Sequence, residues 1–122
     1  YMNICSYVQE WSLMALQFST HINMEKEALS EEVILQMAES FKALSDPTRL
    51  QILALLFDGE RTVGDMADHL DVSQSAVSHQ LRILRNMDIV RYHKEGREVY
   101  YFLADDHVRD ILLRTLEHIL DD

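Results

Sequence analysis

The spacing of apolar residues predicts helices along most of the chain after Ser30. Ser30 precedes Glu31, Glu32 and a run in which apolar side chains recur every three or four positions, which is typical of an amphipathic helix with acids in its first turn. The segment Ser45-Asp46-Pro47 ends this helix and begins another, because aspartate caps helices well and proline suits the first helical position. The second helix is apolar on nearly every side, so we expect it at the centre of the fold.

The next segment has helix-turn-helix proportions. Thr62 starts a short helix that ends at Leu70, and after a tight turn at 71–72 Ser73 starts a longer helix. The longer helix carries apolar residues at core spacing: Ala76, Val77, Leu81 and Leu84.

A hairpin and a last helix complete the predicted order. Residues 89–93 and 98–103 are rich in β-formers and flank a polar turn in which Gly96 supplies an unusual dihedral. A final helix starts at Asp105 or Asp106 and runs close to the end of the chain. The predicted fold class is therefore mainly α with a small β-hairpin.

Residues 1–29 are interpreted as an N-terminal appendage of unknown role, and residues 30–122 as the folded domain. Residues 4–19 have the composition of a helix anchored by Trp11 and Phe18, and Met24 is an alternative natural start. The pattern assigns this segment no function.

Composition excludes several classes of protein. The chain has 122 residues, of which 48% are hydrophobic and 26% charged, so it can build one domain with an apolar core. No run of about 18 apolar residues is present, so no membrane span is expected. Cys5 is the only cysteine, which rules out an internal disulfide and fits a reducing, cytoplasmic location.

The charge is unevenly distributed. The net charge is −10, but residues 73–101 hold five Lys/Arg against three acids, and the rest of the chain is correspondingly more acidic. A locally positive face on an acidic body is compatible with DNA binding, because phosphate contacts act at short range in salt.

The helix-turn-helix and the hairpin together suggest a surface that reads DNA. Polar residues near the amino end of the longer helix suit base edges in a groove, and basic residues of the hairpin suit the backbone or the minor groove. The candidate contacts are Gln74, Ser75, Val77, Ser78, His79, Arg82, Lys94 and Arg97. An ordinary solvated helix face and a polar turn are the alternative for any one of them.

Three runs of the sequence closely resemble the ArsR/SmtB family of metalloregulatory repressors. They are residues 41–53, residues 72–85 and residues 94–101, and the stretch Ser-x-Ser-x-x-Ser-His-Gln-Leu that begins at Ser73 is quite specific. The resemblance covers residues 31–122. It implies a homodimeric winged helix-turn-helix that binds operator DNA with an imperfect inverted repeat and represses genes of metal resistance or transport.

The last helix carries a possible metal site in two halves. Asp105 and His107 lie at its amino end, and His118 and Asp121 at its carboxyl end. His107 and His118 share a helix face but are about 16 Å apart along the axis, so one ion cannot bind both within one chain. Two antiparallel copies of the helix would bring one half-pair to the other, across a seam of Val108, Ile111, Leu112, Leu116 and Ile119. From the spacing alone, surface histidines and helix-capping aspartates remain the alternative.

The resemblance implies that this intersubunit site exists. In zinc sensors of the family, an Asp-x-His…His-x-x-Glu/His pattern on the last helix binds zinc, for which cobalt can substitute, and zinc releases the repressor from DNA. Asp121 departs from the family's usual Glu or His. The Cys-x-Cys type motif of the arsenic, lead and cadmium sensors is absent from residues 62–68. The resemblance also suggests that the free ring nitrogen of a metal-bound histidine forms a hydrogen bond to the backbone near the helix-turn-helix, and His118 is the candidate for this link.

Other functions remain as alternatives. A repressor of the same fold could sense nickel, cobalt or a thiol oxidant through Cys5 or His21, and a winged helix could serve only to dock proteins. His69 and His93, beside the DNA elements, are expected to pack or to contact phosphate. A zinc hydrolase is disfavoured because four protein ligands leave no position for water, so the chain is not expected to be an enzyme.

Overall fold

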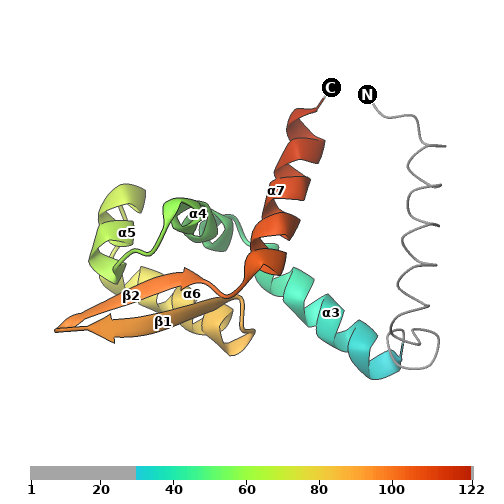
Figure 1. Ribbon diagram of the computed structural model, residues 1–122, viewed down its shortest axis with the longest axis horizontal. Coiled ribbons are helices and arrows are strands. Elements are labelled where there is room, and N and C mark those ends of the chain that lie inside the picture. The colour runs from blue at the N-terminus through green and yellow to red at the C-terminus, as the bar shows by residue number, and fades with distance from the viewer. Residues whose placement is uncertain (1–29, 122) are drawn as a thin grey trace. The chain divides into compact units, whose positions relative to one another are not determined.

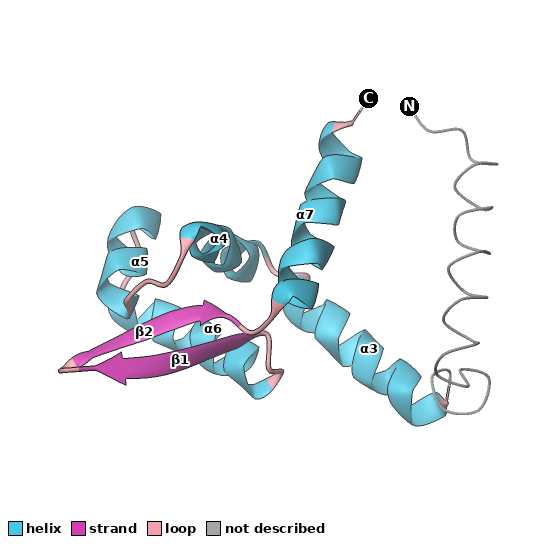
Figure 2. Cartoon of the chain, in the orientation of Figure 1, coloured by secondary structure: helices cyan, strands magenta, loops and turns pink. Residues whose placement is uncertain are grey.

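The computed structural model describes residues 30–121, and these confirm a mainly helical chain with one antiparallel hairpin (Figures 1 and 2). Residues 39–120 form one compact unit, and residues 30–38 and Asp121 belong to another. The elements in chain order are α3 (Glu31–Leu44), α4 (Pro47–Leu55), the 3-10 turn η1 (Leu56–Asp58), α5 (Val63–Leu70), α6 (Gln74–Asn86), β1 (Val90–Glu95), β2 (Glu98–Leu103) and α7 (Asp106–Leu120). The predicted appendage, residues 1–29, lies outside the described residues.

The helices begin where the sequence predicts caps. The side chain of Asp46 accepts a hydrogen bond from the Arg49 amide at 3.0 Å, and Thr62 and Ser73 do the same for the third residues of α5 and α6. Ser30 accepts from the Val33 amide at 3.3 Å at the start of α3. Each cap satisfies an amide that the helix itself leaves unpaired and contributes about 1 kcal/mol.

The hairpin is longer than predicted and has a third backbone partner. β1 runs to Glu95, and Gly96 occupies the turn with a φ of 65°. Arg61 adds an isolated bridge to β2: its amide donates to the Tyr101 carbonyl at 3.0 Å, and the Tyr101 amide donates back at 2.8 Å. The segment between η1 and α5 is therefore fixed beside the hairpin.

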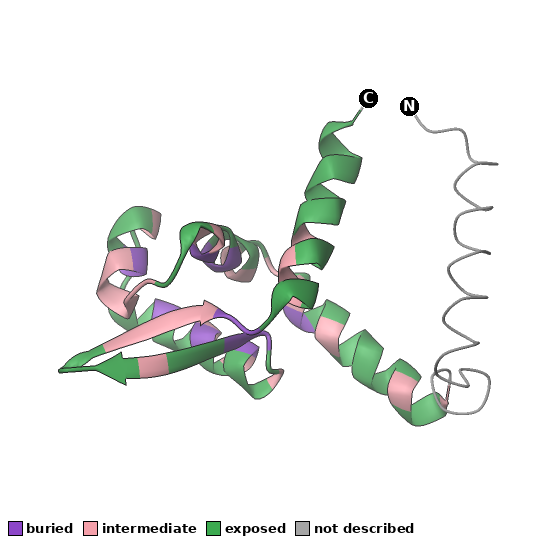
Figure 3. Cartoon of the chain, in the orientation of Figure 1, coloured by how far each residue is buried: buried purple, intermediate pink, exposed green. Residues whose placement is uncertain are grey.

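The core lies where α4, η1, α5, α6 and the start of β1 meet. Its largest fully buried side chains are Ile52, Leu53, Leu56, Met66, Leu81, Leu84, Val77 and Val90. Burying each large aliphatic side chain contributes roughly 1.5–3 kcal/mol. Buried positions are concentrated in these elements, as Figure 3 shows. Leu50 is partly exposed, so α4 is central without being enclosed on all sides.

Helix α7 contrasts with the core. None of its residues is buried, and Figure 3 shows it exposed along most of its length. Val108 and Leu112 pack against the core of their own chain, whereas Ile111, Leu116 and Ile119 are exposed. The five residues of the predicted intersubunit seam therefore differ within one chain: Val108 and Leu112, in the amino-terminal part of the helix, contact its own core, and the seam itself stays a prediction.

None of the described helices is both long enough and apolar enough to cross a membrane.

Candidate nucleic-acid and metal-binding sites

The α5–α6 pair has the geometry of a helix-turn-helix. α5 ends at Leu70, and its C-cap Asp71 takes the left-handed conformation with a φ of 54° and turns the chain sharply. The side-chain amide of Gln74 on α6 reaches Gly64 of α5, where a Cβ would lie 3.5 Å from its Nε2 atom, an ordinary van der Waals contact. With Val77, Leu81 and Leu84 buried, the opposite face of α6 is presented outward.

Most of the predicted DNA contacts on α6 are exposed. Gln74, Ser75, Ser78, His79 and Arg82 all lie on its outer side. Val77 is 0% exposed and packs in the core, so it cannot touch a base, and its place among the candidate contacts is corrected. Ala76, expected inward, is exposed instead. Helical geometry explains both results, because the core-facing stripe runs through positions 77, 81 and 84.

Arg49 holds α6 in place, a role that the sequence pattern did not predict. Its Nε donates to the Ala43 carbonyl at 2.6 Å, and its Nη1 donates to Gln80 Oε1 at 3.2 Å. The guanidinium therefore joins the end of α3 to the polar side of α6. Arg49 falls in the first of the three runs that carry the family resemblance, but apolar periodicity gives a single polar residue no tertiary role.

The hairpin carries two different kinds of basic residue. Arg91 donates to both carboxylate oxygens of Asp88, at 3.0 and 2.9 Å, and this hydrogen bonding lowers the pKa of Asp88 and raises that of Arg91. Lys94 and Arg97 are exposed near the tip, and no carboxylate of residues 30–121 forms an ion pair with them. The tip cations, unlike Arg91, are therefore available to a phosphate.

The amino-terminal half of the predicted metal site is assembled within one chain. Asp105 Oδ1 caps α7 by accepting from the Val108 amide at 2.9 Å, and Asp105 Oδ2 lies 3.7 Å from His107 Nδ1. The His107 side chain is 92% exposed. One imidazole nitrogen and one carboxylate oxygen thus lie side by side, and both are donors that suit zinc.

The carboxyl-terminal half is only partly placed. His118 lies exposed in the last turn of α7, eleven residues after His107. Asp121 follows the end of the helix and is grouped with residues 30–38 rather than with residues 39–120 of the same chain. The structure therefore brings Asp105 and His107 together and leaves His118 at the other end of the helix.

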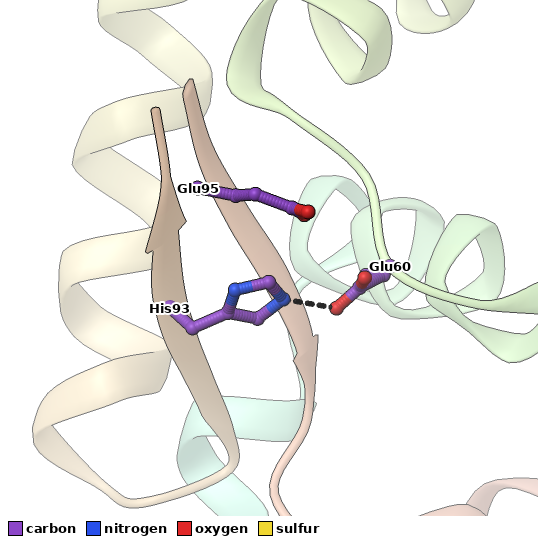
Figure 4. Close-up of side chains that lie close together, drawn as sticks. All are labelled: Glu60, His93 and Glu95. Atoms are coloured by element: carbon purple, nitrogen blue, oxygen red, sulfur yellow. Dashed lines mark hydrogen bonds and ion pairs between the residues drawn. The ribbon is translucent and has the colours of Figure 1, made fainter. Parts of the chain in front are cut away.

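A second cluster of possible ligands lies beside the hairpin, as Figure 4 shows. It consists of Glu60, His93 and Glu95, and a hydrogen bond joins His93 Nε2 to Glu60 Oε2. The sequence pattern indicated only a packing or phosphate role for His93, and it did not single out the two glutamates. The sequence pattern gives little indication of this cluster, because Glu60 and His93 are 33 positions apart in the chain.

Comparisons with known proteins agree with this geometry. The family described as "Bacterial regulatory protein, arsR family" matches residues 46–92. A Synechocystis protein named as a transcriptional repressor SmtB homolog is 46% identical over 96 residues, which cover 79% of this chain and 73% of that protein. The chain belongs to the ArsR/SmtB family. It is a DNA-binding transcriptional regulator of winged helix-turn-helix fold and not an enzyme.

Two further relatives extend the ArsR/SmtB assignment. A cadmium resistance transcriptional regulatory protein CadC homolog from Staphylococcus aureus is 40% identical, with 80% of this chain and 81% of that protein covered. The homodimeric winged helix-turn-helix DNA-binding domain of a possible ArsR-family regulator from Mycobacterium bovis superposes with a TM-score of 0.68 at 28% identity, covering 80% of this chain and 90% of that one.

Proposed function

We propose that this ArsR/SmtB-family chain is a zinc-responsive repressor that binds operator DNA as a homodimer and releases it when zinc binds across the dimer. The observation that carries the proposal is α7: no residue of this helix is buried, and the neighbouring side chains of Asp105 and His107 lie at the start of a helix that also has exposed apolar residues. A helix of this kind is stable where a second chain covers it.

The exposed apolar residues suggest how two copies meet. Leu116 and Ile119 are 48% and 69% exposed, and by helical spacing they continue the stripe of Val108 and Leu112 towards the end of α7. Antiparallel packing of two such helices would place the Asp105 and His107 of one protomer against His118 and Asp121 of the other. Two equivalent sites result, each with two imidazoles and two carboxylates, a donor set that suits tetrahedral zinc and that cobalt can mimic.

The DNA side of the proposal rests on α6 and the hairpin tip. Gln74, Ser75, Ser78, His79 and Arg82 are proposed to meet the major groove, and Lys94 and Arg97 to hold the backbone. Two recognition helices must lie about 34 Å apart to enter successive major grooves of an inverted repeat. Occupied α7 sites are proposed to favour a dimer geometry that no longer matches this spacing, with His118 linking the site to the helix-turn-helix.

A zinc titration of the DNA complex tests this function. A duplex selected from a random library by the full-length protein is labelled, and binding is followed by fluorescence anisotropy. Zinc is expected to weaken binding by roughly 5- to 150-fold, the usual range of allosteric coupling, and by reciprocity DNA weakens zinc binding by the same factor. His118→Ala should remain on DNA at zinc concentrations that release the parent.

The matched control is His69→Ala. His69 is an exposed histidine on α5 whose side chain interacts only locally with Asp65, and its replacement should leave zinc-induced release unchanged. Equal affinity for DNA with and without zinc would refute metal-induced release. Parent-like release by His118→Ala would remove α7 from the sensing mechanism.

A further inference from the structure

We propose that Glu60, His93 and Glu95 form a second metal site, contained within one chain, for a divalent transition ion of the zinc class. The site uses none of the α7 residues and goes beyond the proposed function. It lies where the segment between η1 and α5 meets the outer face of the hairpin.

The backbone brings the three side chains together. His93 and Glu95 are two positions apart on β1, so they project from the same face of the hairpin. Glu60 immediately precedes Arg61, and the paired hydrogen bonds between Arg61 and Tyr101 hold this segment against β2. The potential ligand atoms all lie within 4.8 Å of one another, and Figure 4 shows the three side chains directed into one space.

The electrostatics of the cluster favour a cation. Two carboxylates lie within this 4.8 Å, and Glu98 is the cross-strand neighbour of Glu95. Among residues 30–121, no lysine or arginine forms an ion pair with Glu60 or Glu95. Carboxylates this close repel one another unless a cation or a proton lies between them. The hydrogen bond to His93 explains the position of Glu60 but not that of Glu95.

The donor set selects the class of ion. Imidazole suits zinc and its neighbours, whereas magnesium takes oxygen ligands almost exclusively. Tetrahedral ligands about 2.1 Å from zinc lie about 3.4 Å apart, a spacing within the 4.8 Å that bounds the three ligand atoms. The His93 ring is already oriented, because it stacks on Tyr100 with centroids 5.6 Å apart and also contacts Phe102. Three protein ligands leave the remaining position to water.

Calorimetric titration of the full-length protein with zinc tests the site. The titration uses a His107→Ala, His118→Ala background, so that the proposed α7 sites do not contribute. This background is expected to bind one zinc ion per chain at the hairpin. Adding His93→Gln or Glu60→Gln should abolish the binding of this one zinc ion per chain. His69→Gln, which alters another exposed histidine beside a carboxylate, should retain it. Two independent variants on different segments guard against local misfolding, which circular dichroism would reveal.

Each result has a defined meaning. Loss of one equivalent in both cluster variants and its retention in His69→Gln support the site. Equal binding by all variants overturns it, as does displacement of zinc by a modest excess of magnesium, which would show that His93 is not a ligand. These results are independent of the α7 proposal, whose failure would appear as equal stoichiometry in the parent and the His107→Ala, His118→Ala background.

Discussion

Helices α6 and α7 are both amphipathic, but they differ in how far their apolar residues are buried within one chain. α6 directs Val77, Leu81 and Leu84 into the core and leaves a polar face outward. α7 buries no residue completely and keeps Leu116 and Ile119 exposed. The apolar side of α6 is covered within one chain, which leaves its polar side exposed to DNA, whereas part of the apolar side of α7 is not covered. One chain therefore suffices to form the proposed DNA-recognition surface of α6, whereas the proposed metal site of α7 requires two chains.

The largest expected effect is on the free energy of unfolding, and it comes from the core that one chain forms beneath α6. Leu81 is 1% exposed, and replacing it with alanine leaves a cavity in the core. Leu81→Ala should lower the free energy of unfolding by about 2–5 kcal/mol. Urea denaturation followed by circular dichroism measures the loss. Because the cavity lies within one chain, the loss should persist when the protein concentration is changed. A loss that varies with protein concentration would mean that this core is not self-contained.

A substitution in the proposed dimer interface should, in contrast, act only when two chains meet. Leu116→Glu places a charge on the exposed apolar side of α7 and should weaken dimerisation by several kcal/mol, because the seam cannot solvate a buried charge. Sedimentation velocity should show monomers at concentrations where the parent is dimeric. Arg114→Glu, which places the same side chain on the opposite side of the same helix, is the control and should remain dimeric. Persistence of a tight Leu116→Glu dimer would exclude the proposed seam.

Heterodimers test whether metal ligands are shared across the seam. A His107→Ala chain paired with a His118→Ala chain has one complete α7 site and one that lacks both histidines, whereas each homodimer has two incomplete sites. Heterodimers purified with two different tags should therefore bind one more zinc ion tightly per dimer than either homodimer, which is half of the parent's α7 capacity. Equilibrium dialysis measures the difference. No gain in verified heterodimers would mean that Asp105, His107, His118 and Asp121 do not act across chains.

Local patterns predicted the elements of this fold well. Capping residues such as Asp46, Thr62 and Ser73 act through the first turn of their own helix, so the sequence within four residues determines them. The order of helices and the hairpin followed from periodicity in the same way. Val77 was placed both in the core and among the DNA contacts, and the structure resolves that conflict in favour of the core.

Tertiary contacts were harder to predict. The roles of Arg49 and Arg61 depend on carbonyls and side chains that periodicity does not bring near them, and the Glu60 and His93 pair joins segments 33 positions apart. The amino-terminal part of α7 that packs on its own core could not be distinguished from the carboxyl-terminal part that remains open, because Leu112 and Leu116 have the same apolar character and lie on the same side of the helix. A periodic pattern identifies an apolar stripe but not the surface that covers it.

The smallest expected effect concerns the hairpin tip. Arg97 is exposed and unpaired among the described residues, so Arg97→Gln should leave stability nearly unchanged. If it contacts a phosphate, its loss should weaken binding to all duplexes about equally and reduce the slope of log affinity against log salt by about one. Arg114→Gln removes an exposed arginine from α7 instead and should leave the slope unchanged. Anisotropy titrations over a range of salt concentrations, with selected and scrambled duplexes, separate these outcomes. Identical slopes for parent and Arg97→Gln would remove Arg97 from the DNA contact, whereas a loss confined to the selected duplex would show that Arg97 reads sequence.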